Sequence, residues 1–139
     1  MSYFVNIIKI IILILNGVQF NRPFSTEIRG SLEVGKNVSI DRNTIFEGKV
    51  QIGDNASIGN DCQIIDSILE NHVFIKSNSI IEESKIGASS FVGPYARVRG
   101  KSQIKENCQI GNYVEIKSSL VGSRCRINHM AFIGDSDLS

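Results

Sequence analysis

Residues 34–59 read VGKNVS-IDRNTI-FEGKVQ-IGDNAS-IG, so an apolar anchor returns at every sixth position. A small or branched residue stands four places after each anchor. An amphipathic helix repeats every three to four residues and a strand every two, so neither period fits. A six-residue period with one short strand and one turn per repeat is typical of a parallel β-helix. The anchors are Val34, Ile40, Phe46, Ile52, Ile58 and Ile64, then Ile86, Val92, Val98, Ile104, Ile110 and Ile116.

Three such hexads would close one triangular coil of eighteen residues, with the anchors inside and the i+4 residues at the corners. Each coil would pair its strands with the next coil, about 4.8 Å along the axis. The spacing shortens to five residues after Ile64, between Ile75 and Ile80 or Ile81, and after Ile116. The chain from Val34 onward therefore predicts an all-β fold of about six coils. Tight turns with positive φ would suit the glycines that follow anchors, which are Gly35, Gly53, Gly59, Gly87, Gly93, Gly111, Gly122 and Gly134.

The composition limits the classes of function. A chain of 139 residues predicts one domain, and a net charge of +1 with scattered Lys and Arg gives no reason to expect a nucleic-acid partner. The three cysteines, Cys62, Cys108 and Cys125, all fall at the inward i+4 position. We expect them to fill the core in a reduced compartment. No Cys/His pairing has the spacing of metal ligands, so no metal site is expected.

The first part of the chain, residues 1–29, differs from the repeats at residues 30–139. Residues 7–15 are almost continuously aliphatic, but this run is too short to span a bilayer. The sequence predicts a short apolar helix and a linker, with the helix packed on the base of the β-helix. Interfacial contact with a membrane is the alternative reading of this run, and it is not the one expected.

Two cations depart from the scaffold pattern. Arg99 follows the anchor Val98 and Lys117 follows the anchor Ile116, eighteen residues later. One full coil apart, the two side chains should stack on one face, where like charges cost stability unless an anion bridges them. Phosphate suits this pair, because a guanidinium grips two oxygens and an ammonium adds a point charge. A solvated cationic face is the alternative.

His129 stands two residues past Ile127, and the repeat places it next to Asn112 of the preceding coil. An outward imidazole can accept a proton near neutral pH, which makes this residue a candidate general base. A solvent-exposed histidine without a role is the alternative. Its position within two coils of Arg99 and Lys117 favours the first interpretation.

Three segments, residues 93–99 (GPYARVR), 111–117 (GNYVEIK) and 129–135 (HMAFIGD), carry a resemblance. Together with residues 15–48 they resemble, without gaps in their spacing, the acetyltransferase half of the bacterial bifunctional enzymes that make UDP-N-acetylglucosamine. Those enzymes couple a glucosamine-1-phosphate N-acetyltransferase to an N-acetylglucosamine-1-phosphate uridyltransferase. The resemblance implies a left-handed β-helix, a homotrimer with active sites between subunits, and a cytoplasmic protein.

Carried over position by position, the resemblance assigns roles to four residues. Arg99 and Lys117 match residues that hold the phosphate and sugar of the acceptor, and His129 matches the general base that takes a proton from the attacking amine. Phe132 stands where the family usually has a tyrosine that contacts the acceptor. The loss of that hydroxyl puts the identity of the sugar in question.

The resemblance also implies that parts of the enzyme are missing from this sequence. The family continues past the Gly134-Asp135 pair into coils that carry the acetyl-CoA groove, and the uridyltransferase domain with its magnesium site precedes the β-helix. We therefore expect an incomplete acetyltransferase domain, in which acetyl-CoA is the co-substrate but its groove is absent. The alternatives are a hexapeptide acyltransferase for another amino sugar and a non-enzymatic trimeric scaffold or remnant.

Overall fold

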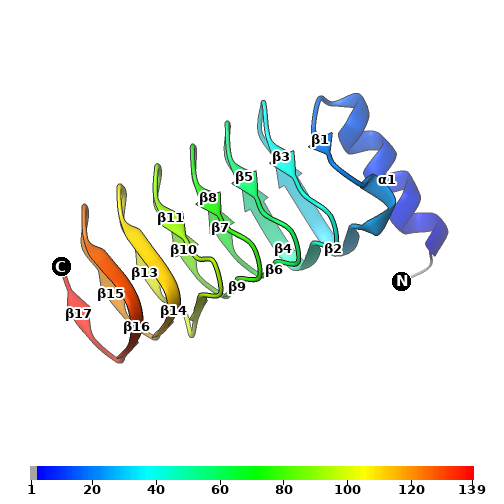
Figure 1. Cartoon of the computed structure of the whole chain (residues 1–139). Helices are drawn as coiled ribbons and strands as arrows, with labels where there is room; N and C mark the ends of the chain where they lie inside the picture. The colour runs from blue at the N-terminus through cyan, green and yellow to red at the C-terminus, as the bar shows by residue number, and fades with distance from the viewer. Residues whose placement is uncertain (1–2) are drawn as a thin grey trace.

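The computed structural model describes residues 3–139, which form a parallel β-helix with one α-helix at its N-terminal end (Figure 1). The helical segments are α1 (Tyr3–Leu15) and a 3-10 turn, η1 (Pro23–Ser25). The strands are β1 (Gln19–Phe20), β2 (Glu27–Val34), β3 (Ser39–Ile40), β4 (Ile45–Ile52), β5 (Ser57–Ile58), β6 (Gln63–Ile65), β7 (Ile68–Leu69), β8 (Phe74–Ile75), β9 (Ile80–Glu82), β10 (Lys85–Ile86), β11 (Phe91–Val92), β12 (Arg97–Arg99), β13 (Gln103–Ile104), β14 (Gln109–Lys117), β15 (Leu120–Val121), β16 (Arg126–Gly134) and β17 (Asp137–Leu138).

The anchors stack in three columns, one for each wall of the coil, and nearly all of them are buried. All strand pairs are parallel, and each pairs with the strand one coil away. The first wall stacks Phe20, Ile40, Ile58, Ile75, Val92, Ile110 and Ile127. The second wall stacks Ile28, Phe46, Ile64, Ile81, Val98, Ile116 and Ile133. The third wall stacks Val34, Ile52, Leu69, Ile86, Ile104, Val121 and Leu138.

The all-β, parallel β-helix class is confirmed, and two details of the predicted repeat change. The stack has about seven coils instead of six, because β1 already pairs with β3 ahead of residue 30. The second five-residue step runs from Ile81 to Ile86, not from Ile75 to Ile80 or Ile81. The reason is that Ile81 is the inward residue and Ile80 is half-exposed. All the short steps therefore lie at one corner, between the second and third walls. The division of the chain after residue 29 stays a prediction.

The turns use a different residue from the one that the sequence suggested. Among the glycines that follow anchors, Gly93 alone has a positive φ. The left-handed residue stands instead three places after the anchor, where asparagine is common: Asn37, Asn43, Asn55, Asn78 and Asn107 have φ between 57° and 61°. Asparagine tolerates this region better than other residues that carry a Cβ. The glycines serve another purpose, which is the close approach of the neighbouring coil.

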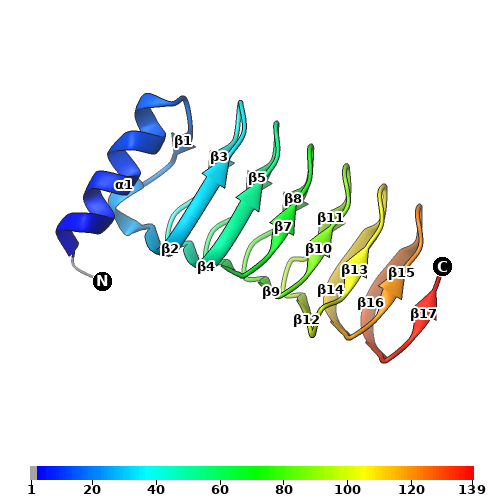
Figure 2. The same cartoon turned by 180° about the vertical axis from the view of Figure 1, so that it is seen from behind.

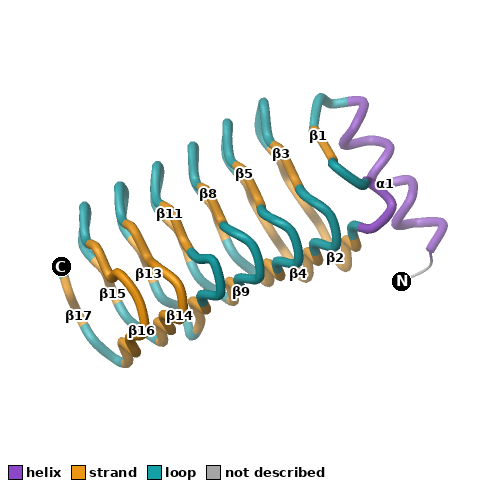
Figure 3. Tube along the Cα trace, viewed as in Figure 1, coloured by secondary structure: helices purple, strands orange, loops and turns teal. Residues whose placement is uncertain are grey.

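The hand of the coil agrees with the resemblance. In Figure 2 the strands on the near side rise toward the upper corner, and the chain descends on the far side while it advances from α1 toward the C-terminus. This motion describes a left-handed helix. Figure 3 shows the regular alternation of strand and turn that keeps the walls flat.

The predicted N-terminal helix is confirmed, and it lies across the first coil (Figure 1). Ile10 is completely buried in the core, and Leu13 packs against it. Asn6 donates from Nδ2 to the Thr26 carbonyl oxygen (2.9 Å) and accepts from the Ile28 N–H (2.8 Å). The helix therefore supplies partners to backbone groups that β2 would otherwise leave open at the edge of the sheet. No helix within residues 3–139 is long and apolar enough to cross a membrane.

Candidate functional site

Arg99 and Lys117 lie directly above one another, as the repeat predicts. β12 pairs with β14 in a register that opposes Arg99 to Lys117 and Val98 to Ile116. Because both anchors are fully buried, the two cationic residues beside them face outward. Adjacent strands in a sheet are about 4.8 Å apart, so the two side chains begin within one coil spacing of each other on the second wall.

A carboxylate from the same wall neutralises part of this charge. Glu115 accepts a hydrogen bond of 2.6 Å from Arg99 Nε, and each side chain is about one third exposed. On the other side of Val98, Arg97 donates from Nε and Nη2 to Glu82 Oε1 at 3.2 and 3.0 Å. The ion pair of Glu115 offsets the repulsion between Arg99 and Lys117, which the sequence reasoning assigned to a bound anion alone.

Glu115 and Glu82 are the residues that the sequence reasoning missed. The signal was present, because the run Arg97-Val98-Arg99 lies one coil below Glu115-Ile116-Lys117. In that register Arg97 opposes Glu115, but the bond that forms is the diagonal one from Arg99. Long side chains reach diagonal neighbours across a ladder, so directly opposed positions do not decide the partner.

His129 lies in register with Asn112, as predicted, and its side chain is exposed. It precedes the second wall, since the corner residue Met130 has a φ of 51° and Ala131 then turns inward. Lys117 lies beyond that wall's anchor, opposite Gly134. Five residue steps separate His129 from Gly134, at most about 17 Å of extended chain. The structure thus places His129 at one end of the wall and the stacked cations at the other.

Phe132 lies between these two groups. It opposes Glu115 in the ladder and is 60% exposed. Its ring leans over Gly134, because a Cβ built on that glycine would lie 2.7 Å from Phe132 Cε1. The ring therefore lies next to the position opposite Lys117. The second wall thus carries Arg99, Lys117 and Phe132, and the exposed Phe132 ring adds an apolar surface beside the two cations.

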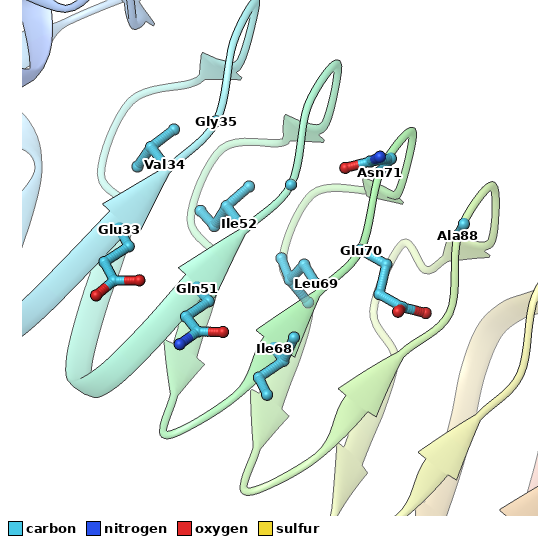
Figure 4. A pocket seen from close by; sticks show the side chains of 11 residues that line it. Glu33, Val34, Gly35, Gln51, Ile52, Ile68, Leu69, Glu70, Asn71 and Ala88 are labelled. Atoms are coloured by element: carbon cyan, nitrogen blue, oxygen red, sulfur yellow. The ribbon is translucent and has the colours of Figure 1, made fainter.

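The third wall has a shallow hollow that none of the predicted site residues lines (Figure 4). Its floor is the wall formed by β2, β4 and β7, and Glu33, Gln51 and Ile68 stand on that wall. Glu70 and Asn71 lie at its edge. The carboxylates of Glu33 and Glu70 would repel a phosphate in this hollow. The second wall, with Arg99 and Lys117, therefore remains the candidate site for an anion.

Two of the three cysteines fill the core as expected. Cys62 and Cys108 are fully buried, and Cys108 Sγ lies 3.0 Å from the Gly122 carbonyl oxygen. Burial raises the pKa of the Cys62 thiol to about 11 and also raises the pKa of Cys108. A thiolate is the reactive form, so neither residue is suited to act as a nucleophile. Cys125 differs, because it is only partly buried in the last coil. Within residues 3–139 no three His, Cys, Asp or Glu side chains cluster as metal ligands would.

This difference predicts selective alkylation. Iodoacetamide at pH 8 should modify Cys125 at least about tenfold faster than Cys62, because only exposed thiolate reacts. Peptide mass spectrometry over a time course measures both rates in one sample. The urea-unfolded protein is the control, since all three thiols should then react alike. Equal rates in the folded protein would contradict the burial of Cys62.

Comparison with known proteins identifies the family of this chain. Residues 28–105 match the model of the GMPPB C-terminal domain. The bifunctional protein GlmU of Wigglesworthia glossinidia brevipalpis is 40% identical over 126 residues, which are 91% of this chain and 27% of that protein. GlmU of a Marinobacter nauticus strain is 40% identical over 126 residues, which are 91% of this chain and 28% of that protein. The chain thus spans about a quarter of the length of the curated relatives that it matches.

A solved structure supports the fold. A variant of GDP-perosamine N-acetyltransferase from Caulobacter crescentus, crystallised with CoA and GDP-perosamine, superposes with a TM-score of 0.51 at 14% identity. The match covers 85% of this chain and 54% of that enzyme. The chain therefore belongs to the hexapeptide-repeat β-helix family that the GMPPB C-terminal domain represents, and its sequence is related to the acetyltransferase region of GlmU.

Proposed function

We propose that the chain carries the acceptor half of a glucosamine-1-phosphate N-acetyltransferase site, which works in the cytoplasm as part of a homotrimer. Acetyl-CoA would be the acetyl donor. The single observation that supports this proposal best is the register of Arg99 with Lys117 on a wall that also carries Phe132. The 40% identity to GlmU over nearly the whole chain supports the choice of substrate.

The two cations would hold the phosphate of the acceptor. Glu115 uses the Nε of Arg99, and a guanidinium has further N–H donors on its two Nη atoms. Those donors and the Lys117 ammonium can bind phosphate oxygens while Glu115 fixes the direction of the Arg99 side chain. The Phe132 ring would pack against the sugar, in place of a hydrogen bond from a hydroxyl.

His129 would act as the general base. The acceptor amine attacks the thioester carbonyl, a C–N bond forms, the C–S bond breaks, and the thiolate of CoA leaves with a proton from the medium. The imidazole would take the proton that the amine loses. The amine and the phosphate of glucosamine-1-phosphate stand on adjacent ring carbons, so one acceptor would not span the wall from Lys117 to His129. The cations that hold its phosphate and the histidine that meets its amine would come from neighbouring subunits of the trimer. Binding both substrates at one boundary turns a bimolecular encounter into an oriented one.

An acetyl-transfer assay with acetyl-CoA and glucosamine-1-phosphate tests this proposal, read by release of free CoA thiol. His129→Ala should lower kcat by about 10²- to 10⁴-fold, the usual contribution of a general base. Lys117→Ala should raise KM for the sugar phosphate instead. Arg97→Ala is the matched control, because Arg97 is a cation of the same wall, two residues from Arg99, but pairs with Glu82. Equal rates for the wild type and His129→Ala would remove the histidine from the mechanism.

Two observations favour specific alternatives. Phe132 favours a hexapeptide acyltransferase for another amino sugar, and a panel of amino-sugar phosphates in the same assay would reveal it. The bond between Arg99 and Glu115 favours a non-enzymatic trimeric scaffold, since it satisfies part of the charge within the chain. Calorimetry that finds no heat with any sugar phosphate, together with no turnover, would support the scaffold.

A further inference from the structure

The helix α1 is apolar on nearly all sides. Its inner face carries the completely buried Ile10, with Asn6 and Leu13 beside it, and Lys9 Nζ donates to the Gly30 carbonyl oxygen at 2.6 Å. The exposed arc carries large apolar residues, with Phe4 71% and Leu15 80% exposed. A surface helix usually has one apolar stripe against the core and a polar face toward water, whereas a helix that is apolar all round is normally buried. The apolar outer face of α1 therefore indicates that this face is built to be covered.

The centre of the exposed arc has the spacing of a helix-pairing seam. Phe4, Ile8, Ile11 and Leu15 follow one another at intervals of four, three and four residues, and all four are exposed. Residues at this spacing form one stripe along a helix and insert as knobs into the holes of a facing helix. Ile12 and Ile14 flank the stripe and are also exposed. We call these six residues the α1 seam.

The area of this face is what a specific interface needs. The six residues, with the exposed Tyr3 at the start of the helix, are between 41% and 80% exposed. A fully exposed aromatic side chain presents about 150 to 250 Å², and an aliphatic one is near the lower end of that range. The face therefore offers roughly 600 to 750 Å² of apolar surface, approaching the ~800 Å² that each partner contributes to a standard protein interface. A patch of this size is uncommon on a monomer that has no partner.

The place of the helix decides which partner fits. α1 covers the end of the stack where the first coil lies, and its outer face points away from the coils (Figures 1 and 2). A second copy can approach this end without meeting any of the three walls. We propose that α1 is a self-association surface, on which the α1 seam of one copy packs against the seam of a second copy across a two-fold axis. The two β-helices are then joined base to base.

A membrane surface fits this face less well. Helices that lie in a membrane interface carry Lys and Arg on their polar side, where these residues meet anionic headgroups. The exposed arc of α1 contains no cation, and the one cation of the helix, Lys9, faces the coil and reaches Gly30. An apolar face without charges can pack against a second copy of itself without burying an unpaired charge.

Sedimentation velocity on the double variant Phe4→Glu/Ile11→Lys tests the proposal. The charges are chosen to suit the helix, with Glu near its N-terminus and Lys near its C-terminus. At micromolar concentration the assembly of the wild type should have twice the mass of the assembly of this variant. An additional assembly through the walls would form in both proteins and would leave this ratio unchanged. Phe91→Glu is the control, because Phe91 is an exposed wall residue with Lys76 5.9 Å from its ring. That control should keep the wild-type mass, and circular dichroism should show that both variants stay folded.

A cross-link identifies the contact itself. In a Cys125→Ser background, Ile11→Cys should give a disulfide-linked pair on mild oxidation, since a central seam residue meets its copy in either helix orientation. Gln103→Cys, exposed on a wall, should not. Equal masses for the wild type and the double variant would overturn the proposal. So would wild-type protein that keeps the lower mass in solution and floats with phosphatidylcholine vesicles, since a membrane would then cover the seam. Acetyl transfer should be unaffected in every case, so this test is independent of the proposed function.

Discussion

Replacing Gly87 with alanine is expected to destabilise the β-helix by more than about 3 kcal/mol, as measured by urea unfolding. Gly87 follows the anchor Ile86 in the middle of the stack and has an ordinary φ. A Cβ at this position would lie 2.5 Å from the Lys105 carbonyl carbon and 2.6 Å from the Glu106 nitrogen. Both atoms belong to the backbone of the next coil, so no side-chain rotation relieves the overlap. The two coils would have to separate and lose ladder hydrogen bonds.

Gly17→Ala is the matched control for this prediction. Gly17 has a φ of 95°, but nothing lies within 4 Å of the Cβ that alanine would add. Only backbone strain should result, at a cost of about 1 to 2 kcal/mol. Because a stack of coils can open locally, hydrogen exchange at Ile86 and Ile104 should show faster opening in Gly87→Ala alone. A larger loss of stability in Gly17→Ala than in Gly87→Ala would contradict the steric role of these glycines.

The contrast between these glycines also shows what the sequence could reveal about the turns. Glycines after several of the anchors are visible in the sequence, but two physical reasons for a glycine there, positive φ and lack of space, look the same in the sequence. The structure separates these two reasons, since a left-handed residue stands two places after most of these glycines, as Asn37 does after Gly35. Contact with the next coil is a tertiary property, and only the stacked geometry shows it.

The fold itself was predictable because every coil needs an inward apolar residue at the same position of each wall. A six-residue period fixes which side chains point inward, and one wrong register would expose a whole column of anchors. The prediction failed where two aliphatic residues compete, at Ile80 and Ile81. Either could serve as the anchor from sequence alone, and the corner geometry selects Ile81.

The candidate site was predictable in part for the same reason. The repeat places Arg99 over Lys117 and Asn112 beside His129, because ladder positions follow from counting. The bond of Arg99 to Glu115 did not follow from counting, since long side chains choose among several neighbours. Repeats also say nothing about a segment outside them, so the sequence predicted that α1 packs on the coil but not that its apolar arc faces outward.

Replacing Asn6 with leucine is expected to lower the free energy of unfolding by about 2 to 6 kcal/mol. Leucine has the branched shape and the number of side-chain heavy atoms of asparagine, so most of the packing against the first coil is retained. The loss comes from the Thr26 carbonyl and the Ile28 N–H, which now bond to the Asn6 amide and would be left without a partner at a buried helix contact. Each unsatisfied buried group costs about 1 to 3 kcal/mol.

Asn16→Leu is the matched control, because the same substitution is made at an exposed position just after α1. It should change stability by less than about 0.5 kcal/mol. If α1 protects the open edge of β2, Asn6→Leu should also raise light scattering on heating, since an uncovered strand edge recruits other chains. Equal unfolding curves for Asn6→Leu and Asn16→Leu would show that the helix is held by its apolar contacts at Ile10 and Leu13 alone. The edge of the first coil would then need another source of protection.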